Sequence, residues 1–157
     1  MEDDASNAGL KGIPATMSGV LLVGHGGFEM LRFSDDIPVP RPASGEVLIR
    51  VAAAAINNTD MNTRIGWYSK AVRGGTAQGG STGFGSAAED DASWTGAPLS
   101  FPRIQGADCC GYIVAVGAGV DPGRIGERVI VRNLLRTYVG YRPWECWTFG
   151  SECDGAF

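Results

Sequence analysis

The sequence predicts one mainly β domain, and three observations support this. Short apolar runs rich in β-branched residues alternate with turn-forming residues, as in a β-rich fold. The chain contains 24 glycines and 8 prolines, which favour many tight turns. No long stretch has the spacing of an amphipathic helix, and 157 residues suffice for one hydrophobic core.

The composition excludes several classes of function. The net charge is −4 and basic residues do not form runs, so nucleic-acid binding has no electrostatic support. No apolar stretch is long enough to cross a bilayer, and the acidic N-terminus lacks the apolar segment of a secretory signal. Four unevenly spaced cysteines do not indicate a disulfide framework. We therefore expect a reduced, cytoplasmic protein that does not bind membranes.

The N-terminal part predicts a flexible arm followed by a hairpin. Residues 1–16 are small and polar, as in a loose arm. Residues 17–23 form the first expected strand, a four-residue Gly-rich turn follows, and residues 30–33 begin the returning strand. His25, the one histidine, lies in this turn. Without a carboxylate or cysteine beside it, it is interpreted as a loop or surface residue rather than a catalytic base.

Two strands and a short helix are expected next. The alternating prolines of 37–42 predict an extended edge segment, because proline has no N–H for a central strand. Residues 46–56 predict a strand with an Ala-rich end that allows close packing. Asn58 or Thr59 could cap a helix from 60 to about 66, where a glycine would end it.

Residues 71–97 differ from the rest of the chain. They are rich in Gly, Ser, Thr and Ala and contain one tryptophan, Trp94. This composition predicts a long flexible loop, and a lid over a substrate site is the alternative. Its glycine pairs are not a phosphate-binding loop, because no strand precedes them and no helical run follows.

The segment from residue 101 to 131 organises the domain. A Gly-Ala-Asp corner at 106–108 leads into an apolar strand at 112–116, expected to be buried on both faces. A Gly- and Pro-containing turn and a strand at 128–131 follow. Beyond it, the concentration of aromatic residues at 138–149 suggests either a core edge or a contact surface, such as that of a homodimer.

Three motifs carry a resemblance to a known family. They are Phe-Pro-x-Ile-x-Gly-Ala-Asp from residue 101, Gly-x-Ile-Val-Ala-Val-Gly from residue 111, and Ile-Gly-Glu-Arg-Val from residue 125. Over residues 18–131 the chain resembles the N-terminal catalytic domain of medium-chain dehydrogenases/reductases, the superfamily of alcohol dehydrogenases and quinone oxidoreductases. The resemblance implies a GroES-like (chaperonin-10-like), partly open β-barrel with one or two short helices over 17–157.

The resemblance also bears on zinc. Zinc-dependent members carry a cysteine and a histidine at the positions that Asn57 and Ala107 occupy here. An amide is a poor zinc ligand and a methyl group is none. The cysteines Cys109 and Cys110 are adjacent and would point to opposite faces of a strand, so they do not replace the missing ligands. We therefore expect no catalytic zinc and no metal site.

The zinc-independent, quinone oxidoreductase-like mechanism is the remaining interpretation. There a hydride from NADPH (or NADH) reaches a carbonyl or conjugated alkene of a small-molecule substrate. The resemblance implies that Asn57 and Thr59 contact the nicotinamide and take part in catalysis, Thr59 as a hydroxyl proton relay. Tyr68 could donate a proton, although it could equally be an aromatic at a helix exit.

Three further residues complete the expected site. Ala107 and Asp108 would line the substrate cleft, and Asp108 could instead hold an arginine. Asp60 is interpreted as structural, bonding nearby backbone or Arg64.

The sequence does not predict a nucleotide-binding fold within these residues. The Gly-rich run 117–123 follows a strand, but Pro122 and the next strand leave no room for the helix that binds a pyrophosphate. We expect this part alone to be inactive and to hold no cofactor. Two alternatives stay open: a zinc-dependent alcohol dehydrogenase domain, and a non-catalytic chaperonin-10-like binding module.

Overall fold

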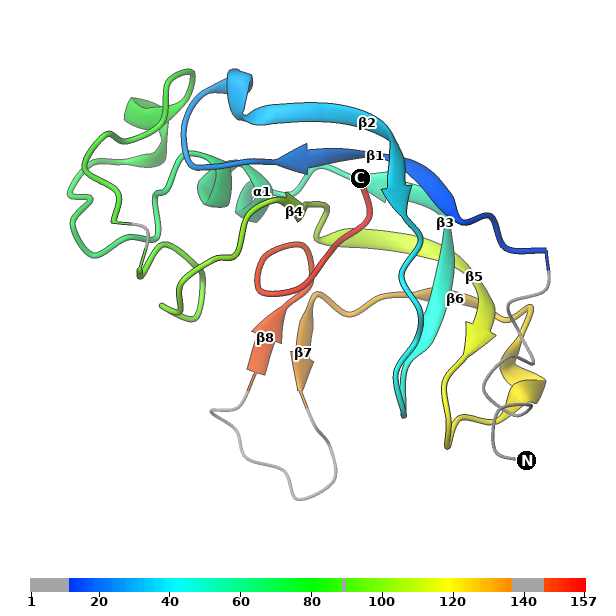
Figure 1. Ribbon diagram of the computed structural model, residues 1–157. Coiled ribbons are helices and arrows are strands. Elements are labelled where there is room, and N and C mark those ends of the chain that lie inside the picture. Colours follow the sequence, from blue (N-terminus) through cyan, green and yellow to red (C-terminus); the bar gives the residue numbers. More distant parts are fainter. Residues whose placement is uncertain (1–11, 89, 137–145) are drawn as a thin grey trace.

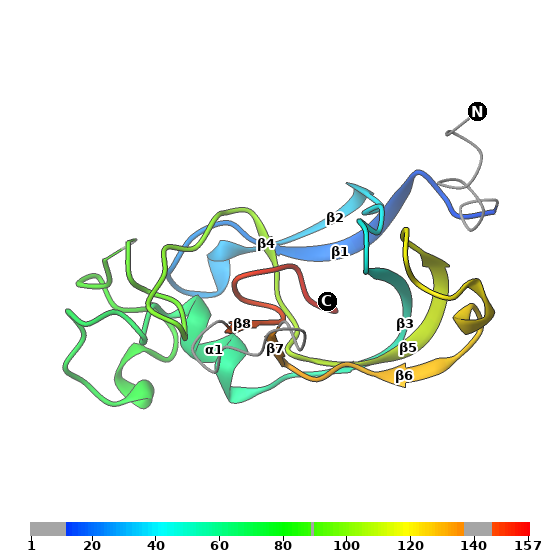
Figure 2. The same ribbon diagram turned by 90° about the horizontal axis from the view of Figure 1, so that it is seen from below.

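The computed structural model describes residues 12–88, 90–136 and 146–157. Two three-stranded antiparallel sheets face each other, with the C-terminal segment between them (Figures 1 and 2). One α-helix and a two-stranded ribbon lie at one end of this arrangement. The sheets do not close on each other, so the predicted mainly β, partly open barrel is confirmed.

The first sheet has the order β2-β1-β4. Its strands are β1 (Thr16–Leu22), β2 (Leu31–Pro38) and β4 (Arg103–Ile104). The predicted hairpin of β1 and β2 is confirmed, but its connection is longer than four residues. The Glu29 carboxylate accepts the Gly27 N–H at 2.9 Å, and a short 3₁₀ helix, Phe28–Met30, forms before β2. The outer strand β2 ends at Pro38, in accord with the predicted edge position.

The second sheet has the order β3-β5-β6. Its strands are β3 (Val47–Ala55), β5 (Asp108–Val116) and β6 (Arg128–Ile130). β5 begins earlier than predicted, because its first residues pair with the Ala-rich end of β3: Ala54 lies opposite Cys109 and Ala55 opposite Asp108. The expectation that β5 is buried on both faces is wrong. Its side chains alternate, and Tyr112 is 37% exposed.

The remaining strands, β7 (Leu134–Arg136) and β8 (Cys146–Thr148), form an antiparallel ribbon. Much of the aromatic-rich segment expected at 138–149 lies outside the described residues. After β8 the chain returns to β4 and β1. There the Phe157 N–H donates to Gln105 O at 3.0 Å, and the Val20 N–H donates to Phe157 O at 3.3 Å.

Helix α1 (Asn58–Arg64) starts earlier than predicted, and its N-cap is Asn57 rather than Asn58 or Thr59. Asn57 Oδ1 accepts the Thr59 N–H, and the Asp60 side chain accepts the Asn57 N–H, which together make a capping box. Gly66, with a φ of +72°, follows the helix as expected.

The Gly-rich loop 71–97 lies beside α1 (Figure 1). Its described residues contain no strand and one short 3₁₀ helix, Thr76–Gly79. Two of them are nevertheless fully buried: Ala92 is 0% and Ser93 1% exposed. The loop is therefore joined to the body of the domain near residue 92.

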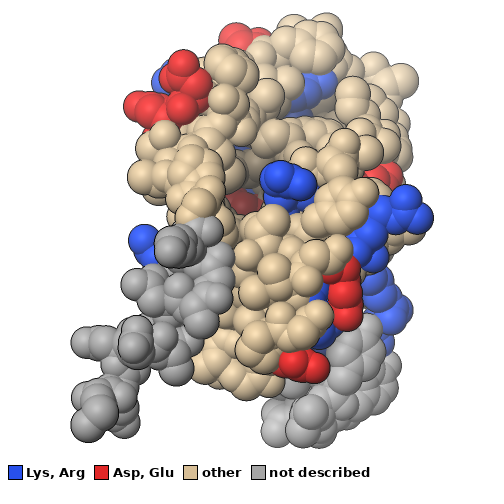
Figure 3. Space-filling model, turned by 90° about the vertical axis from the view of Figure 1, so that its right-hand side faces the viewer, with Lys and Arg blue, Asp and Glu red and all other residues tan. Residues whose placement is uncertain are grey.

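The surface shown in Figure 3 carries scattered charges rather than a continuous basic area. Within the described parts of the chain, no helix has the length and apolar character needed to span a bilayer.

Candidate active site

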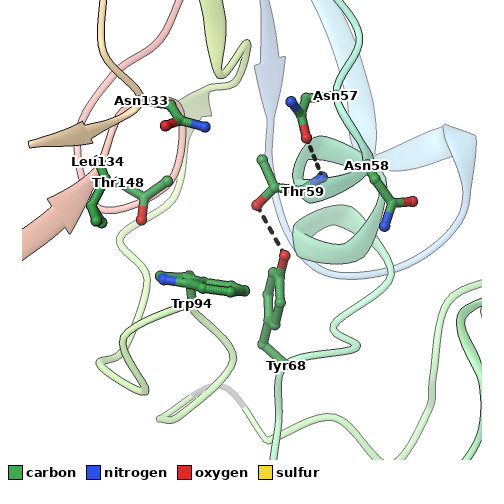
Figure 4. Close-up of a pocket in the computed structure, with 8 residues that line it drawn as sticks. All are labelled: Asn57, Asn58, Thr59, Tyr68, Trp94, Asn133, Leu134 and Thr148. Atoms are coloured by element: carbon green, nitrogen blue, oxygen red, sulfur yellow. Dashed lines mark hydrogen bonds between the residues drawn. The ribbon is translucent and has the colours of Figure 1, made fainter.

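A pocket of about 370 Å³ lies beside the N-terminus of α1 (Figure 4). Its wall comes from the start of α1, the segment after it, the 71–97 loop and the β7–β8 ribbon. None of the described residues that line it is charged. They are Asn57, Asn58, Thr59, Tyr68, Trp94, Asn133, Leu134 and Thr148. All three predicted catalytic residues, Asn57, Thr59 and Tyr68, are thus brought together in one pocket.

Both the oxygen and the nitrogen of the Asn57 side-chain amide form hydrogen bonds. Its Oδ1 accepts the Thr59 N–H at 3.1 Å, and its Nδ2 donates to Asp108 Oδ2 at 3.1 Å. These two contacts define which atom of the amide is nitrogen. The amide nitrogen carries two hydrogens, and only one is used by Asp108. The second N–H is available to a molecule in the pocket.

Thr59 and Tyr68 form a pair of hydroxyl groups. The Tyr68 O–H donates to Thr59 Oγ1 at 3.0 Å (Figure 4). Because Thr59 accepts this bond, its own proton is free to be donated to a further acceptor. Tyr68 is fixed by edge-to-face contacts with Trp67 and Trp94, with ring centroids 5.6 Å apart in both pairs. The arrangement can therefore deliver a hydrogen bond, and a proton, to an oxygen bound beside Thr59.

Asp60 joins α1 to the corner at 106–108. Its carboxylate accepts the N–H groups of Asn57 at 2.8 Å, Gly106 at 3.0 Å and Ala107 at 3.1 Å. The structural role is as predicted, and of the two expected partners the bonds go to backbone; Arg64 donates to Gly26 O and Gly80 O. Burial raises the pKa of the Asp60 carboxyl; the three N–H donors oppose this rise and the charge of Asp108 adds to it.

The two residues expected in the substrate cleft lie behind the pocket wall. Ala107 is 0% exposed, and neither Ala107 nor Asp108 is among the described residues that line the pocket. Asp108 holds the Asn57 amide rather than an arginine. Its effect on the site is therefore to orient Asn57.

Glu152 connects the 71–97 loop to the end of β8. It accepts the Thr95 hydroxyl at 2.8 Å and the Thr148 N–H at 2.6 Å. Burial acts to raise the pKa of Glu152, but hydrogen bonds from Ser93, Thr148 and Thr95 outweigh it, so this pKa lies below its ordinary value. The charged carboxylate thus holds together two walls of the pocket, those that carry Trp94 and Thr148.

Sequence reasoning missed five residues of the pocket: Asn58, Trp94, Asn133, Leu134 and Thr148. One signal was available, since Trp94 is the one tryptophan in a loop rich in small residues. Leu134 and Thr148 belong to the β7–β8 ribbon and Asn133 directly precedes it. Asn58 is the first residue of α1, between Asn57 and Thr59. The Thr148 hydroxyl is buried at the wall and has no hydrogen-bond partner among the described residues.

His25 lies in a loop, as predicted, and outside the pocket. Its Nδ1 is 2.7 Å from Thr63 O at the end of α1, and its ring meets Phe101 edge-on at 5.0 Å. It therefore supports the C-terminal end of the helix.

The donor atoms at the pocket do not suit zinc. Within the described ranges, no three His, Cys, Asp or Glu side chains come together as a metal site would require. The pocket itself offers amides and hydroxyls. Cys109 is buried in β5 and burial raises the pKa of its thiol, which disfavours the thiolate that binds zinc.

Comparison with protein families gives one match that covers most of the chain. The model described as "Alcohol dehydrogenase GroES-like domain" matches residues 43–157. The NAD(P)H oxidoreductase RTN4IP1, mitochondrial, of Dictyostelium discoideum is 31% identical over 114 residues, which cover 72% of this chain and 26% of that protein. Rat (Rattus norvegicus) quinone oxidoreductase is 28% identical over 113 residues, 72% of this chain and 26% of the enzyme. The chain thus spans about a quarter of the length of these relatives.

Solved structures show the same fold. A Sinorhizobium meliloti protein described as an alcohol dehydrogenase is 43% identical, with a TM-score of 0.71, and the match covers 92% of this chain and 37% of that one. An NAD-dependent alcohol dehydrogenase is 28% identical, with a TM-score of 0.61, over 88% of this chain and 35% of that one.

Proposed function

Because this chain belongs to the alcohol dehydrogenase GroES-like domain family, we propose that it is the substrate-side domain of a zinc-independent, NAD(P)H-dependent oxidoreductase. The enzyme would reduce a carbonyl or a conjugated alkene of a small molecule. Relatives named quinone oxidoreductase and NADPH-dependent alkenal/one oxidoreductase support this class of reaction. The observation that carries the proposal is the Tyr68–Thr59 hydroxyl pair beside the Asn57 amide in one pocket.

In the proposed reaction the chain binds, orients and protonates the substrate. The carbonyl oxygen lies beside Thr59, which donates its proton while Tyr68 donates to Thr59 in turn. The second N–H of Asn57 would donate to an oxygen of the bound substrate or to the carboxamide oxygen of a nicotinamide. The nicotinamide, when bound, supplies the hydride. NADPH is the cofactor we propose, with NADH as the alternative.

The rest of the cofactor would be held elsewhere. Within the described residues, the Gly-rich run 117–123 leads only into a three-residue 3₁₀ helix, Pro122–Arg124, which offers no helix N-terminus for a pyrophosphate. We therefore propose that the 157 residues alone do not turn over substrate.

The test compares the 157-residue chain with a longer protein in which a nucleotide-binding domain follows it. Each is given NADPH and a quinone, and NADPH oxidation is followed by absorbance. We expect turnover by the longer protein and none by the shorter chain. Turnover at ordinary enzyme rates by the 157-residue chain would contradict the proposed division of the site.

A further inference from the structure

Trp94 is unusual among the described residues of the pocket because it leaves much of a large apolar side chain uncovered. Its side chain is 58% exposed, although the two residues before it, Ala92 and Ser93, are fully buried. Figure 4 shows one face of the indole turned toward the space between Thr59 and Thr148. An indole exposed in this way gains free energy when an apolar surface covers it.

The position of this indole is fixed from both sides. Ser93 Oγ accepts the Ala97 N–H at 3.0 Å, and Thr95 Oγ1 donates to Glu152 Oε1 at 2.8 Å. The ring itself meets Tyr68 edge-on, at 5.6 Å and an interplanar angle of 88°. A surface that is already ordered loses little entropy when a ligand stacks on it.

The electrostatics of the pocket restrict the ligand further. The described lining residues are all uncharged. Three acidic groups in the described parts of the chain lie behind them: Asp60, bonded to the Asn57 N–H; Asp108, bonded to the Asn57 side chain; and Glu152, bonded to the Thr148 N–H. An anionic ligand would lose its hydration, find no cation among the lining residues and be repelled by these carboxylates.

We propose that Trp94 is a specificity-determining residue of this site, which selects planar, conjugated and uncharged carbonyl compounds by stacking them against its indole. The proposal rests on the function proposed above and specifies its substrate class. Glu152 acts as a positioning residue, because it holds the segment that carries Trp94 against β8.

Equilibrium dialysis of three ketones against the 157-residue chain, without cofactor, tests the proposal. Acetylnaphthalene is planar, uncharged and inert toward thiols; acetyldecalin is its saturated counterpart; carboxyl-substituted acetylnaphthalene adds a negative charge. We expect acetylnaphthalene to bind more tightly than either of the other two. In Trp94→Ala its Kd should rise between about 2-fold and about 10-fold, the range for one aromatic contact. Trp94→Phe should keep the Kd within about 2-fold of the wild type.

Trp147→Ala is the matched control, since Trp147 on β8 is a partly exposed indole that does not line the pocket. It should leave the Kd unchanged. Circular dichroism of each variant confirms that it is folded. Equal binding of acetylnaphthalene and acetyldecalin, an unchanged Kd in folded Trp94→Ala, or no binding by the wild type would each overturn the proposal. Dialysis does not depend on hydride transfer, so the turnover assay of the longer protein judges the proposed function separately.

Discussion

Replacing Asp60 by alanine should lower the free energy of unfolding by more than most single substitutions do. In Asp60→Ala three backbone N–H groups lose their acceptor, at 2.8, 3.0 and 3.1 Å. Two of these donors belong to the buried residues Gly106 and Ala107. An orphaned buried donor costs about 1–3 kcal/mol, so this pair costs about 2–6 kcal/mol.

Part of that cost is offset, because the substitution also removes a carboxylate whose charged form burial disfavours. We expect a net loss of about 2–4 kcal/mol in the free energy of unfolding.

Urea denaturation followed by circular dichroism measures this loss. Asp35→Ala is the control, since Asp35 lies exposed on β2, and it should change the free energy of unfolding by no more than about 0.5 kcal/mol. Hydrogen exchange at Gly106 and Ala107 should also become faster in Asp60→Ala. A loss below about 1 kcal/mol would refute the argument that Asp60 joins α1 to the corner.

The pH dependence of the same site has a definite sign. The pKa of Asp60 is raised above its ordinary value of 3.8, so the folded state holds more protons than the unfolded state between the two pKa values. The part of the stability that depends on the Asp60 proton is complete below about pH 3.8 and is lost as the pH rises through the raised value, whereas the hydrogen bonds to the three N–H groups remain. The stability of the wild type relative to Asp60→Asn should therefore decrease as the pH rises. A relative stability that increases with pH over this range would contradict the assignment.

Three further predictions concern the pocket. In the longer protein with NADPH, Thr59→Val should lower kcat by about 100-fold and Tyr68→Phe by about 10-fold with KM little changed, because proton delivery is lost or weakened; an unchanged kcat in Thr59→Val would exclude the relay. The pKa of Glu152 is lowered, so its stabilising effect is present above its ordinary value of 4.5 and is lost as the pH falls through the folded value. In urea titrations, the free energy of unfolding of Glu152→Gln should therefore decrease less between about pH 5 and acid pH than that of the wild type. An equal decrease in both proteins would show that Glu152 does not cause it. Metal analysis of washed protein should find far less than one zinc per chain, and stoichiometric zinc would contradict the zinc-independent assignment.

The strands could be predicted where pattern and turn chemistry agree. β3 and the β1–β2 hairpin follow directly from short apolar runs that lie next to glycine-containing turns. The helix cap was misplaced because adjacent asparagines, Asn57 and Asn58, are both good caps. Asp60 decides between them, since it lies three residues after Asn57 and completes a capping box there.

The pocket was predictable only in part, for a physical reason. Asn57 and Thr59 lie in one motif and Tyr68 follows the same helix, so a local resemblance indicates them. Trp94 and Thr148 reach the pocket through contacts between segments distant in sequence: the Thr95–Glu152 bond joins residues 57 positions apart. Periodicity and spacing carry no information about such contacts.

Asn57 both caps α1, by accepting the Thr59 N–H, and donates to Asp108. These two roles restrict how a related sequence could acquire a zinc ligand at this position. A cysteine there would present a sulfur suited to zinc, but sulfur is a weak hydrogen-bond acceptor and would release the Thr59 N–H at the start of α1. It would also leave Asp108 without its amide donor. A metal-binding descendant would therefore have to rebuild the beginning of this helix along with the ligands. Intermediates with one change would lose stability before they gained affinity for a cation.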